Sequence, residues 1–248
     1  MGRRAILVDV NQCIGCQMCV EGCQEANGHP VHVSEGFSEQ SFTFLMDRGD
    51  DVYVRRLCMH CEDPSCVSVC PVAALIKEPQ GQVTYNAGKC MGCRYCMLAC
   101  PFGVPSYEWY SAMPRVRKCE MCVHRGDEGP ACAEVCPTEA TLWGDRDQLI
   151  AEAESRLANS PEEYYPYIYG LKEAGGTDVF FIGPRNPGEL GLPQVGHTPM
   201  PELTWRALRF VPDVAIFGGV LLGGMFWLTK RKADVADAEH RQEAPRDR

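Results

Sequence analysis

The sequence lacks the features that mark most catalytic and nucleic-acid-binding proteins. Its 248 residues carry a net charge of −9, so there is no basic excess of the kind that binds nucleic acid. It also has no recognisable nucleophile–base arrangement, phosphate loop or signature of a substrate pocket. We therefore expect neither a catalytic site nor a nucleic-acid partner.

A hydrophobic export signal is also missing from the N-terminal residues. Arg3 and Arg4 precede an apolar stretch, but that stretch stops at Asp9, and the first cysteine follows at Cys13. This leaves no room for the hydrophobic region of a signal peptide. Residues 4–10 are better interpreted as a short strand that leads into a cysteine-containing loop.

Cysteine, in contrast, is abundant and regularly spaced. All sixteen cysteines lie within residues 1–144 in four groups of four, which are Cys13, Cys16, Cys19 and Cys23; Cys58, Cys61, Cys66 and Cys70; Cys90, Cys93, Cys96 and Cys100; and Cys119, Cys122, Cys132 and Cys136. A secreted protein with eight disulfides would also have this even count. Small disulfide-bonded proteins scatter their cysteines, however, whereas each cysteine here is separated from another by two or three residues.

The spacing is typical of ligands to 4Fe–4S clusters. The first and third groups read C-x2-C-x2-C-x3-C, and the second and fourth keep both ends but stretch the middle to x4 and x9. Pro71, Pro101 and Pro137 follow the last cysteine of three groups, and Gly15 and Gly92 let the backbone approach a cluster. Four zinc sites would also use sixteen thiolates, but zinc sites usually pair two C-x2-C units. We therefore expect four 4Fe–4S clusters.

The order of the groups predicts how they pair. Residues 58–100 hold the second and third groups and form an inner module, so the first and fourth groups, within 1–28 and 115–144, pair as an outer module. In each pair, the fourth cysteine of one group ligates the cluster of the other. The expected ligand sets are Cys13, Cys16, Cys19 and Cys136; Cys119, Cys122, Cys132 and Cys23; Cys58, Cys61, Cys66 and Cys100; and Cys90, Cys93, Cys96 and Cys70.

The expected fold class is α+β, with two pseudo-symmetric bacterial-ferredoxin-like modules of four cluster loops, short strands and short helices in residues 1–144. Alternating apolar residues predict strands at 42–46, 52–57, 82–85 and 140–143. Residues 145–158 are expected to form a helix capped by Asp145 or Asp147 and stopped by Pro161. Together, residues 145–209 are predicted to be this helix and an extended connecting arm with little regular structure apart from a strand at 178–182.

Residues 210–229 form a long apolar run and predict one C-terminal transmembrane helix. About 20 residues at a rise of about 1.5 Å span the core of a bilayer. Asp213 is the only charge in the run and lies near its N-terminal end, where a charge is least costly. A buried core helix is the alternative, although the two Gly-Gly pairs of the run would weaken a soluble helix. Residues 230–248 are expected to form a charged tail, of which residues 233–248 are expected to be disordered.

A few single residues could act on the clusters. His60 and His124 lie inside the second and fourth groups, where they could tune a cluster or simply be exposed loop residues. Arg115, Arg117 and Lys118 precede the fourth group and could offset the negative charge of a cluster or belong to the solvated surface.

The four groups, the stretched fourth group of residues 119–137 and the Ala174-Gly175-Gly176-Thr177 run carry a resemblance. Over residues 4–230 the chain resembles the four-cluster subunits of the dimethyl-sulfoxide-reductase family of complexes, and it is most similar to the membrane-anchored subunits of respiratory formate dehydrogenases and nickel–iron uptake hydrogenases. The resemblance implies a non-catalytic electron-transfer role between a large catalytic oxidoreductase subunit and an integral membrane partner, a quinone-reactive or cytochrome b subunit.

The charges beside the apolar run predict a topology in a bacterial or archaeal cytoplasmic membrane. Lys230, Arg231 and Lys232 follow the run, whereas Arg206 and Arg209 precede it. The positive-inside rule therefore favours a cytoplasmic C-terminus and a periplasmic cluster domain, exported with a partner that carries the signal. A cytoplasmic cluster domain is the alternative. A second function also stays open, namely a membrane-tethered carrier that docks transiently with several enzymes.

Overall fold

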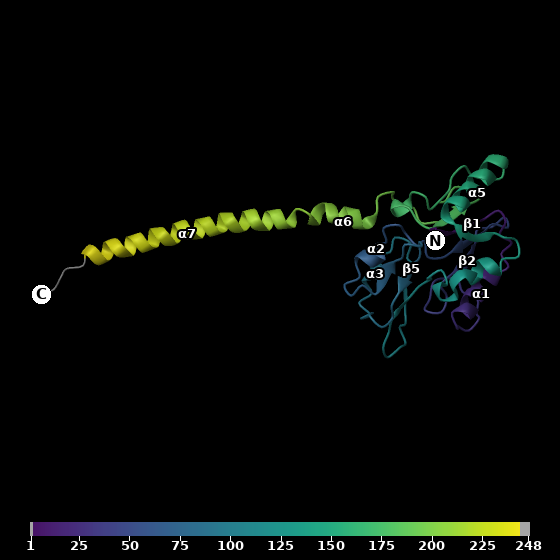
Figure 1. Cartoon of the computed structure of the whole chain (residues 1–248), viewed down its shortest axis with the longest axis horizontal. Helices are drawn as coiled ribbons and strands as arrows, with labels where there is room; N and C mark the ends of the chain where they lie inside the picture. The colour runs from purple at the N-terminus through teal and green to yellow at the C-terminus, as the bar shows by residue number, and fades with distance from the viewer. Residues whose placement is uncertain (1, 244–248) are drawn as a thin grey trace. The chain divides into compact units, whose positions relative to one another are not determined.

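The computed structural model describes residues 2–243 (Figure 1). The chain forms two compact units, Met1–Pro201 and Glu202–Arg248. The first unit contains all sixteen cysteines, and the second consists almost entirely of helix.

The first unit is built on a three-stranded sheet in the order β8-β1-β9. Its central strand, β1 (Arg4–Asp9), pairs antiparallel with β8 (Thr141–Asp145) and parallel with β9 (Val179–Ile182). Because β1 has a strand on each side and is covered on both faces, its run of apolar residues is completely buried. The strand expected at residues 4–10 is therefore confirmed as the centre of the unit.

Each face of this sheet packs against a different core. Ala5 and Leu7 face α5 (Arg146–Asn159), where they contact a cluster that includes Leu149 and Ala153. Ile6 and Val8 face the other way, toward the segments that carry the cysteines. Because side chains alternate along a strand, this one short segment supports both the helical layer and the cysteine-containing layer.

Two hairpins contain the strands predicted at 42–46, 52–57 and 82–85, together with a strand, Leu75–Lys77, that the sequence did not predict. β2 (Phe44–Asp47) pairs with β3 (Tyr53–Arg56), and β4 (Leu75–Lys77) pairs with β5 (Val83–Tyr85). The small ladder of β6 (Ser106–Tyr107) and β7 (Val116–Arg117) follows. α5 begins as expected, because the Asp145 side chain accepts a hydrogen bond from the backbone N–H of Asp147 at 3.1 Å.

The connecting arm expected at residues 145–209 is not a separate feature. Up to Pro201 this segment belongs to the first unit, and β9 supplies one edge of the central sheet. A short 3₁₀ helix, η2 (Glu173–Gly175), lies directly before this strand. The sequence reasoning recognised the strand but could not foresee its parallel partner, which lies more than 170 residues away at Ile6.

Residues 200–243 contain two helices, of which one was missed and one is longer than expected. α6 (Met200–Leu208) was predicted as irregular, but Pro201 stands in its first turn, where a missing N–H costs nothing. α7 (Val211–Glu243) extends through most of the tail that was expected to be disordered. The residues after Lys232 contain strong helix formers and no glycine before Glu243, so they continue the helix. The rest of the expected tail, 244–248, lies outside the described residues.

The apolar part of α7 is fully exposed in the second unit. A helical stretch at Met200–Glu239 contains a window of mean hydropathy 1.7, none of which is buried within the described structure. Phe217 and Val220 are both more than 70% exposed. In the described structure this helix is therefore not the buried core helix that the sequence left as an alternative. Among the described residues, one helix is long and apolar enough to cross a membrane.

Candidate functional site

The loops of the first and third cysteine groups have the same backbone geometry. Gly15 and Gly92 occupy equivalent positions and both have φ of 72°. The residues after the second cysteine, Gln17 and Arg94, are also left-handed, with φ of 62° and 64°. The helices α1 (Met18–Ala26) and α3 (Tyr95–Ala99) begin directly after them. Equal spacing in the sequence therefore produces equal turns, which present three cysteines on one short loop.

The second and fourth groups share a different geometry. Their third cysteines, Cys66 and Cys132, are the second residues of the one-turn helices α2 (Ser65–Ser68) and α4 (Ala131–Glu134). Pro64 and Pro130 precede these two helices in extended conformation. The additional residues of the fourth group form the 3₁₀ segment η1 (Val123–Glu128), so they are accommodated without changing the helix that holds the third cysteine.

The short helices beside the cysteine groups pack in two pairs. α1 packs against α4, and α2 packs against α3 (Figure 1). An antiparallel strand pair accompanies each helix pair, β8 with β1 in one case and β4 with β5 in the other. In both cases one strand follows the last cysteine of one group and the other precedes the first cysteine of its partner group.

The structure brings thiols of the first and fourth groups together. Cys136 and Cys16 raise the pKa of Cys13. Among the cysteines, Cys132 has the largest effect on the pKa of Cys23. Cys122 of the fourth group and Cys19 of its own group also act on Cys23. Two further cysteines have partners in both groups. The pKa of Cys19 is raised by Cys132, Cys13 and Cys136. The pKa of Cys119 is raised by Cys23, Cys58 and Cys132.

Thiols of the second and third groups also lie near one another. The pKa values of Cys61 and Cys66 are both raised by Cys58 and Cys100, although Cys100 belongs to the third group. Conversely, the neighbours of Cys96 are its own group members Cys90 and Cys93 and the more distant Cys70.

Burial keeps most of these thiols protonated when no metal is bound. It raises the pKa of Cys19 to about 11 and that of Cys23 to about 12. In the other pair of groups, burial likewise raises the pKa of Cys66 to about 12 and that of Cys96 to about 11. Only thiolates ligate iron, so cluster binding releases protons and supplies the positive charge that holds these sulfurs deprotonated.

The donor set fits an iron–sulfur cluster. All sixteen cysteines are free thiols, so the disulfide alternative does not describe this structure. Within residues 2–243, no three His, Cys, Asp or Glu side chains lie close enough together to hold a single ion, as a mononuclear zinc site would require. A 4Fe–4S cluster instead takes one thiolate at each of four irons and so spaces its ligands around a cube.

His60, between Cys58 and Cys61, is completely buried rather than an exposed loop residue. Its Nδ1 accepts a hydrogen bond from the backbone N–H of Val83 at 2.9 Å. Burial, together with Lys118 and Lys77, holds the pKa of His60 well below its usual range, so the imidazole is neutral and carries its proton on Nε2. This buried N–H has no partner among the described residues. His124 is exposed, as the simpler interpretation expected.

The basic residues before the fourth group differ in burial. Lys118 is buried, and its Nζ donates to the backbone carbonyls of Val83 and Cys119. Arg117 is partly exposed and forms an ion pair with Glu108 at 2.6 Å. Burial has the larger effect on the pKa of Cys66 and raises it, whereas Lys118 lowers it. Lys118 therefore acts on a cysteine, as one interpretation of the sequence suggested. The Arg117 side chain instead pairs with Glu108.

Sequence reasoning missed Arg55. This residue lies on β3 and is only 2% exposed, and its charge acts on Cys19, Cys23 and Cys13. No local signal marks it, because Arg55 and Arg56 are adjacent basic residues in an ordinary strand pattern. Only the tertiary fold shows that the first points inward.

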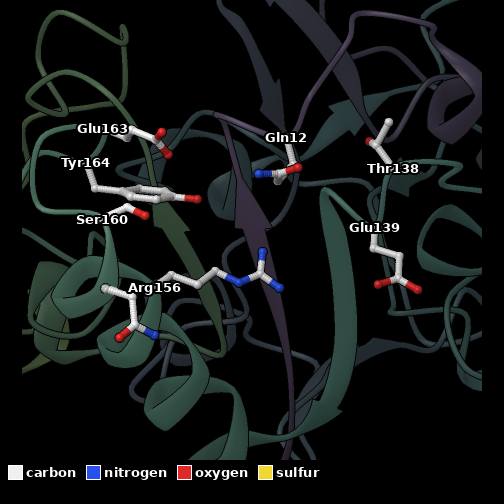
Figure 2. Close-up of a pocket in the computed structure, with 8 residues that line it drawn as sticks. Gln12, Thr138, Glu139, Arg156, Ser160, Glu163 and Tyr164 are labelled. Atoms are coloured by element: carbon white, nitrogen blue, oxygen red, sulfur yellow. The ribbon is translucent and has the colours of Figure 1, made fainter.

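A polar pocket of about 330 Å³ adjoins the outer groups (Figure 2). Gln12 and Thr138 line one part of it, and Arg156 of α5 points into it between Tyr164 and Glu139. Arg156 and Tyr164 both bind the buried carboxylate of Asp9, at 2.8 Å each. Arg156 and Tyr164 therefore contribute to structure by neutralising and hydrogen-bonding this buried carboxylate.

The comparisons with known proteins identify the same chemistry. Residues 50–146, which hold the second to fourth cysteine groups, match the 4Fe–4S dicluster domain. The chain is 37% identical to the hydrogenase-2 operon protein HybA of Escherichia coli O157:H7, over 78% of this chain and 74% of that protein. The chain belongs to the family of ferredoxin-like iron–sulfur subunits.

Two further relatives extend this result. The formate dehydrogenase iron–sulfur subunit of Haemophilus influenzae is 32% identical to the chain, over 95% of the chain and 84% of the relative. A subunit of the tetrathionate reductase of Salmonella typhimurium is 35% identical, over 73% of the chain and 72% of the relative. The resemblance seen in the sequence is thus confirmed, and this iron–sulfur subunit functions in electron transfer.

Proposed function

We propose that the subunit holds four 4Fe–4S clusters in two pseudo-symmetric modules and relays electrons between a catalytic oxidoreductase subunit and a membrane partner. The repeated loop geometry and the matching helix pairs, α1 with α4 and α2 with α3, support the two modules. A chain of clusters supplies one-electron transfer when bound. The residues of the chain hold, separate and electrostatically bias these centres, and the chain has no catalytic role of its own.

The proposed ligand sets cross between groups. The single observation that carries this proposal is that Cys136 neighbours Cys13, and Cys100 neighbours Cys61, each across a long sequence separation. The sets are therefore those that the sequence predicts: two inner sets that exchange Cys70 and Cys100, and two outer sets that exchange Cys23 and Cys136.

Double alanine variants test the crossing, with iron counted after anaerobic purification of the full chain. The wild type is expected to hold about 16 irons, at about four per cluster. Cys70→Ala with Cys96→Ala removes ligands of one cluster and should leave about 12 irons, whereas Cys66→Ala with Cys70→Ala affects two clusters and should leave about 8. The reverse order of these two counts would refute the crossed sets, and a wild type without iron would refute the proposed function.

We propose that α7 crosses the cytoplasmic membrane with its basic end in the cytoplasm. Its exposed apolar window and the trio Lys230, Arg231 and Lys232 support this orientation. The cluster domain then lies on the periplasmic side. Protease treatment of spheroplasts tests the side: digestion of the cluster domain is the expected result, and its protection in intact spheroplasts, followed by digestion after lysis, would place it in the cytoplasm.

In this proposal, the catalytic partner, and not the iron–sulfur subunit, determines which substrate the complex uses. The relatives' names include hydrogenase, formate dehydrogenase and tetrathionate reductase, so similar subunits occur with different substrates. Purification of the tagged subunit from membranes should yield a stable complex with a large catalytic chain. Isolation of the subunit alone would instead favour the tethered carrier considered from the sequence.

A further inference from the structure

We propose that Arg55 is a positioning residue that serves as the shared positive counter-charge of the two outer clusters and raises their reduction potentials relative to the inner pair. The outer clusters are those assigned to Cys13, Cys16, Cys19 and Cys136 and to Cys119, Cys122, Cys132 and Cys23. This inference rests on the proposed function.

The guanidinium of Arg55 is held rigidly inside the protein. Its Nε donates to Thr43 Oγ1 at 2.9 Å, and its Nη1 donates to Thr141 Oγ1 at 3.1 Å. Both threonines are buried, and they come from segments nearly 100 residues apart, Thr141 belonging to β8. Two fixed hydroxyls therefore orient the planar group from different sides.

No carboxylate balances this charge. Among residues 2–243, no Asp or Glu oxygen lies within 4.0 Å of the Arg55 nitrogens. A cation in the interior is strongly unfavourable unless an opposite charge accompanies it. Leu45, the cross-strand partner of Arg55, packs against Cys19 and Cys132, and the charge of Arg55 is coupled to both cysteines, so the opposite charge comes from the cysteine sites.

The charge of Arg55 reaches both outer ligand sets. It acts on Cys13 and Cys19 of one set and on Cys23 and Cys122 of the other. In the inner module the corresponding cation is Lys118, which acts on Cys66. Arg55 thus lies where a single charge serves two metal sites, and the inner pair has a different cation.

A fixed cation at this place affects reduction in a known direction. A cluster with four thiolates is negatively charged, and reduction adds another negative charge. A nearby positive charge in a low-dielectric interior stabilises the reduced form more than the oxidised form, so it raises the reduction potential. Because the guanidinium stays charged at all accessible pH values, this bias is permanent.

Potentiometric titration followed by EPR tests the proposal in the full-length subunit, purified with its partners. In Arg55→Gln, the ratio of reduced to oxidised outer clusters at a fixed potential should fall at least tenfold, about 59 mV per electron. Arg55→Lys keeps the charge and should stay within about threefold of the wild type, about 28 mV at the same conversion. The inner pair should be unchanged in both variants.

Arg56→Gln is the matched control. Arg56 is the next residue of β3, but its guanidinium donates to the carbonyl of Phe102 at 3.1 Å, and its charge is coupled to Cys100. Removing it should leave the outer pair at the wild-type potential. An equal shift of the outer pair in Arg55→Gln and Arg56→Gln would overturn the proposal, because general surface charge would then explain the result.

Iron counts decide the case in which a variant loses clusters. Loss of the outer pair in Arg55→Gln but not in Arg55→Lys supports the need for a positive charge. Loss in both variants, or an unshifted Arg55→Gln, overturns the proposal, while a wild type with four clusters leaves the proposed function intact. A wild type without four clusters would instead refute the proposed function itself.

Discussion

At the scale of single residues, the buried carboxylate of Asp178 joins three distant parts of the first unit. It forms ion pairs with Arg3 at 2.7 Å, Lys77 at 2.6 Å and Arg146 at 3.2 Å. Asp178 has no exposed surface, whereas its three cations are partly exposed. Asp178, directly before β9, therefore links the N-terminal residues, the inner module and the start of α5 through ion pairs.

Asp178→Asn should destabilise the first unit by about 3 kcal/mol, because it removes a buried negative charge from three clustered cations. This loss of stability is at the lower end of the range for breaking a buried ion pair, because the three cations are partly exposed and can turn toward water. For a domain of this size, the midpoint of thermal unfolding should fall by roughly 6–12 °C. Anaerobic circular dichroism would measure this shift.

Glu62→Gln is the control for this prediction. Glu62 pairs with Arg3 at 3.2 Å and Arg146 at 2.8 Å, but its side chain is 36% exposed. An exposed ion pair contributes about 1 kcal/mol or less. Equal losses in the two variants would show that the burial of Asp178 is not what gives the network its strength.

The buried thiols predict how the metal-free chain responds to pH. Burial raises the pKa of Cys19 from 9.0 to about 11 and that of Cys23 from 9.0 to about 12. The folded state then retains protons that the unfolded chain releases, so stability is complete below pH 9 and declines as the pH rises through the folded pKa values. Urea unfolding of the metal-free chain should give a lower midpoint at about pH 10 than at about pH 8.

A double Cys19→Ser, Cys23→Ser variant should weaken this pH dependence, because serine does not ionise in the same range. A midpoint that rises between about pH 8 and about pH 10 would contradict the predicted sign. The test uses the metal-free chain because bound iron would hold the same sulfurs as thiolates.

At the scale of elements, the first cysteine loop depends on one glycine in the left-handed region. A Cβ at Gly15 would lie 2.8 Å from three ring atoms of Tyr53 on β3, and its φ is 72°. Gly15→Ala should therefore displace the loop from β3 and lower the iron content by about four atoms, one cluster. Iron analysis and thermal unfolding together would detect this loss.

Gly28→Ala separates the effect of backbone strain from the effect of the contact with Tyr53. Gly28 has a similar φ of 69°, but nothing lies within 4 Å of an added Cβ. It should cost about 1 kcal/mol of backbone strain and leave the iron content unchanged. Tyr53→Ala should restore the iron content of Gly15→Ala by removing the ring. A full loss of one cluster in Gly28→Ala would show that strain alone, rather than the contact with Tyr53, controls the loop.

The elements also show what sequence reasoning can reach. The β2–β3 hairpin and the capped start of α5 depend on alternation, turn residues and a local cap, so the sequence predicts them. The cysteine groups are local as well, and their spacing predicts loops that the structure contains. The parallel pairing of β9 with β1 and the inward position of Arg55 depend on contacts more than 80 residues apart, and no local pattern specifies them.

Local composition was also misleading in the C-terminal part. The dense charge after Lys232 suggested disorder, yet the same residues have high helix propensity and continue a helix that has already formed. Propagating a helix costs much less than starting one, so the apolar part of α7 makes the charged part helical.

At the scale of the whole molecule, the division near Pro201 separates the redox unit from the apolar helix. A chain that ends at residue 201 should remain folded and keep its iron but be released from membranes. Extraction at alkaline pH would measure the distribution of the protein. Retention of the shortened chain in extracted membranes would show that a partner or another surface, rather than α7, anchors it.

Leu222→Arg provides a point variant of the same test. It places a charge in the middle of the apolar window and should make insertion less favourable by about 3–4 kcal/mol, the difference between Arg and Leu at a helix centre. Lys232→Gln, at the basic end, should leave insertion nearly unchanged. Equal membrane association of the Leu222→Arg variant and the wild type would indicate that the window does not lie in hydrocarbon.

The central position of β1 has a consequence for biosynthesis. β1 pairs with Leu142 and Phe180 through Leu7, so during synthesis it waits for partners that emerge much later. Meanwhile α2 and α3, which are close in the chain, can already meet. Maturation should therefore proceed from the middle of the polypeptide outward, and until residue 182 has emerged the earliest cysteines stay exposed to oxidants, zinc and chaperones in the nascent chain.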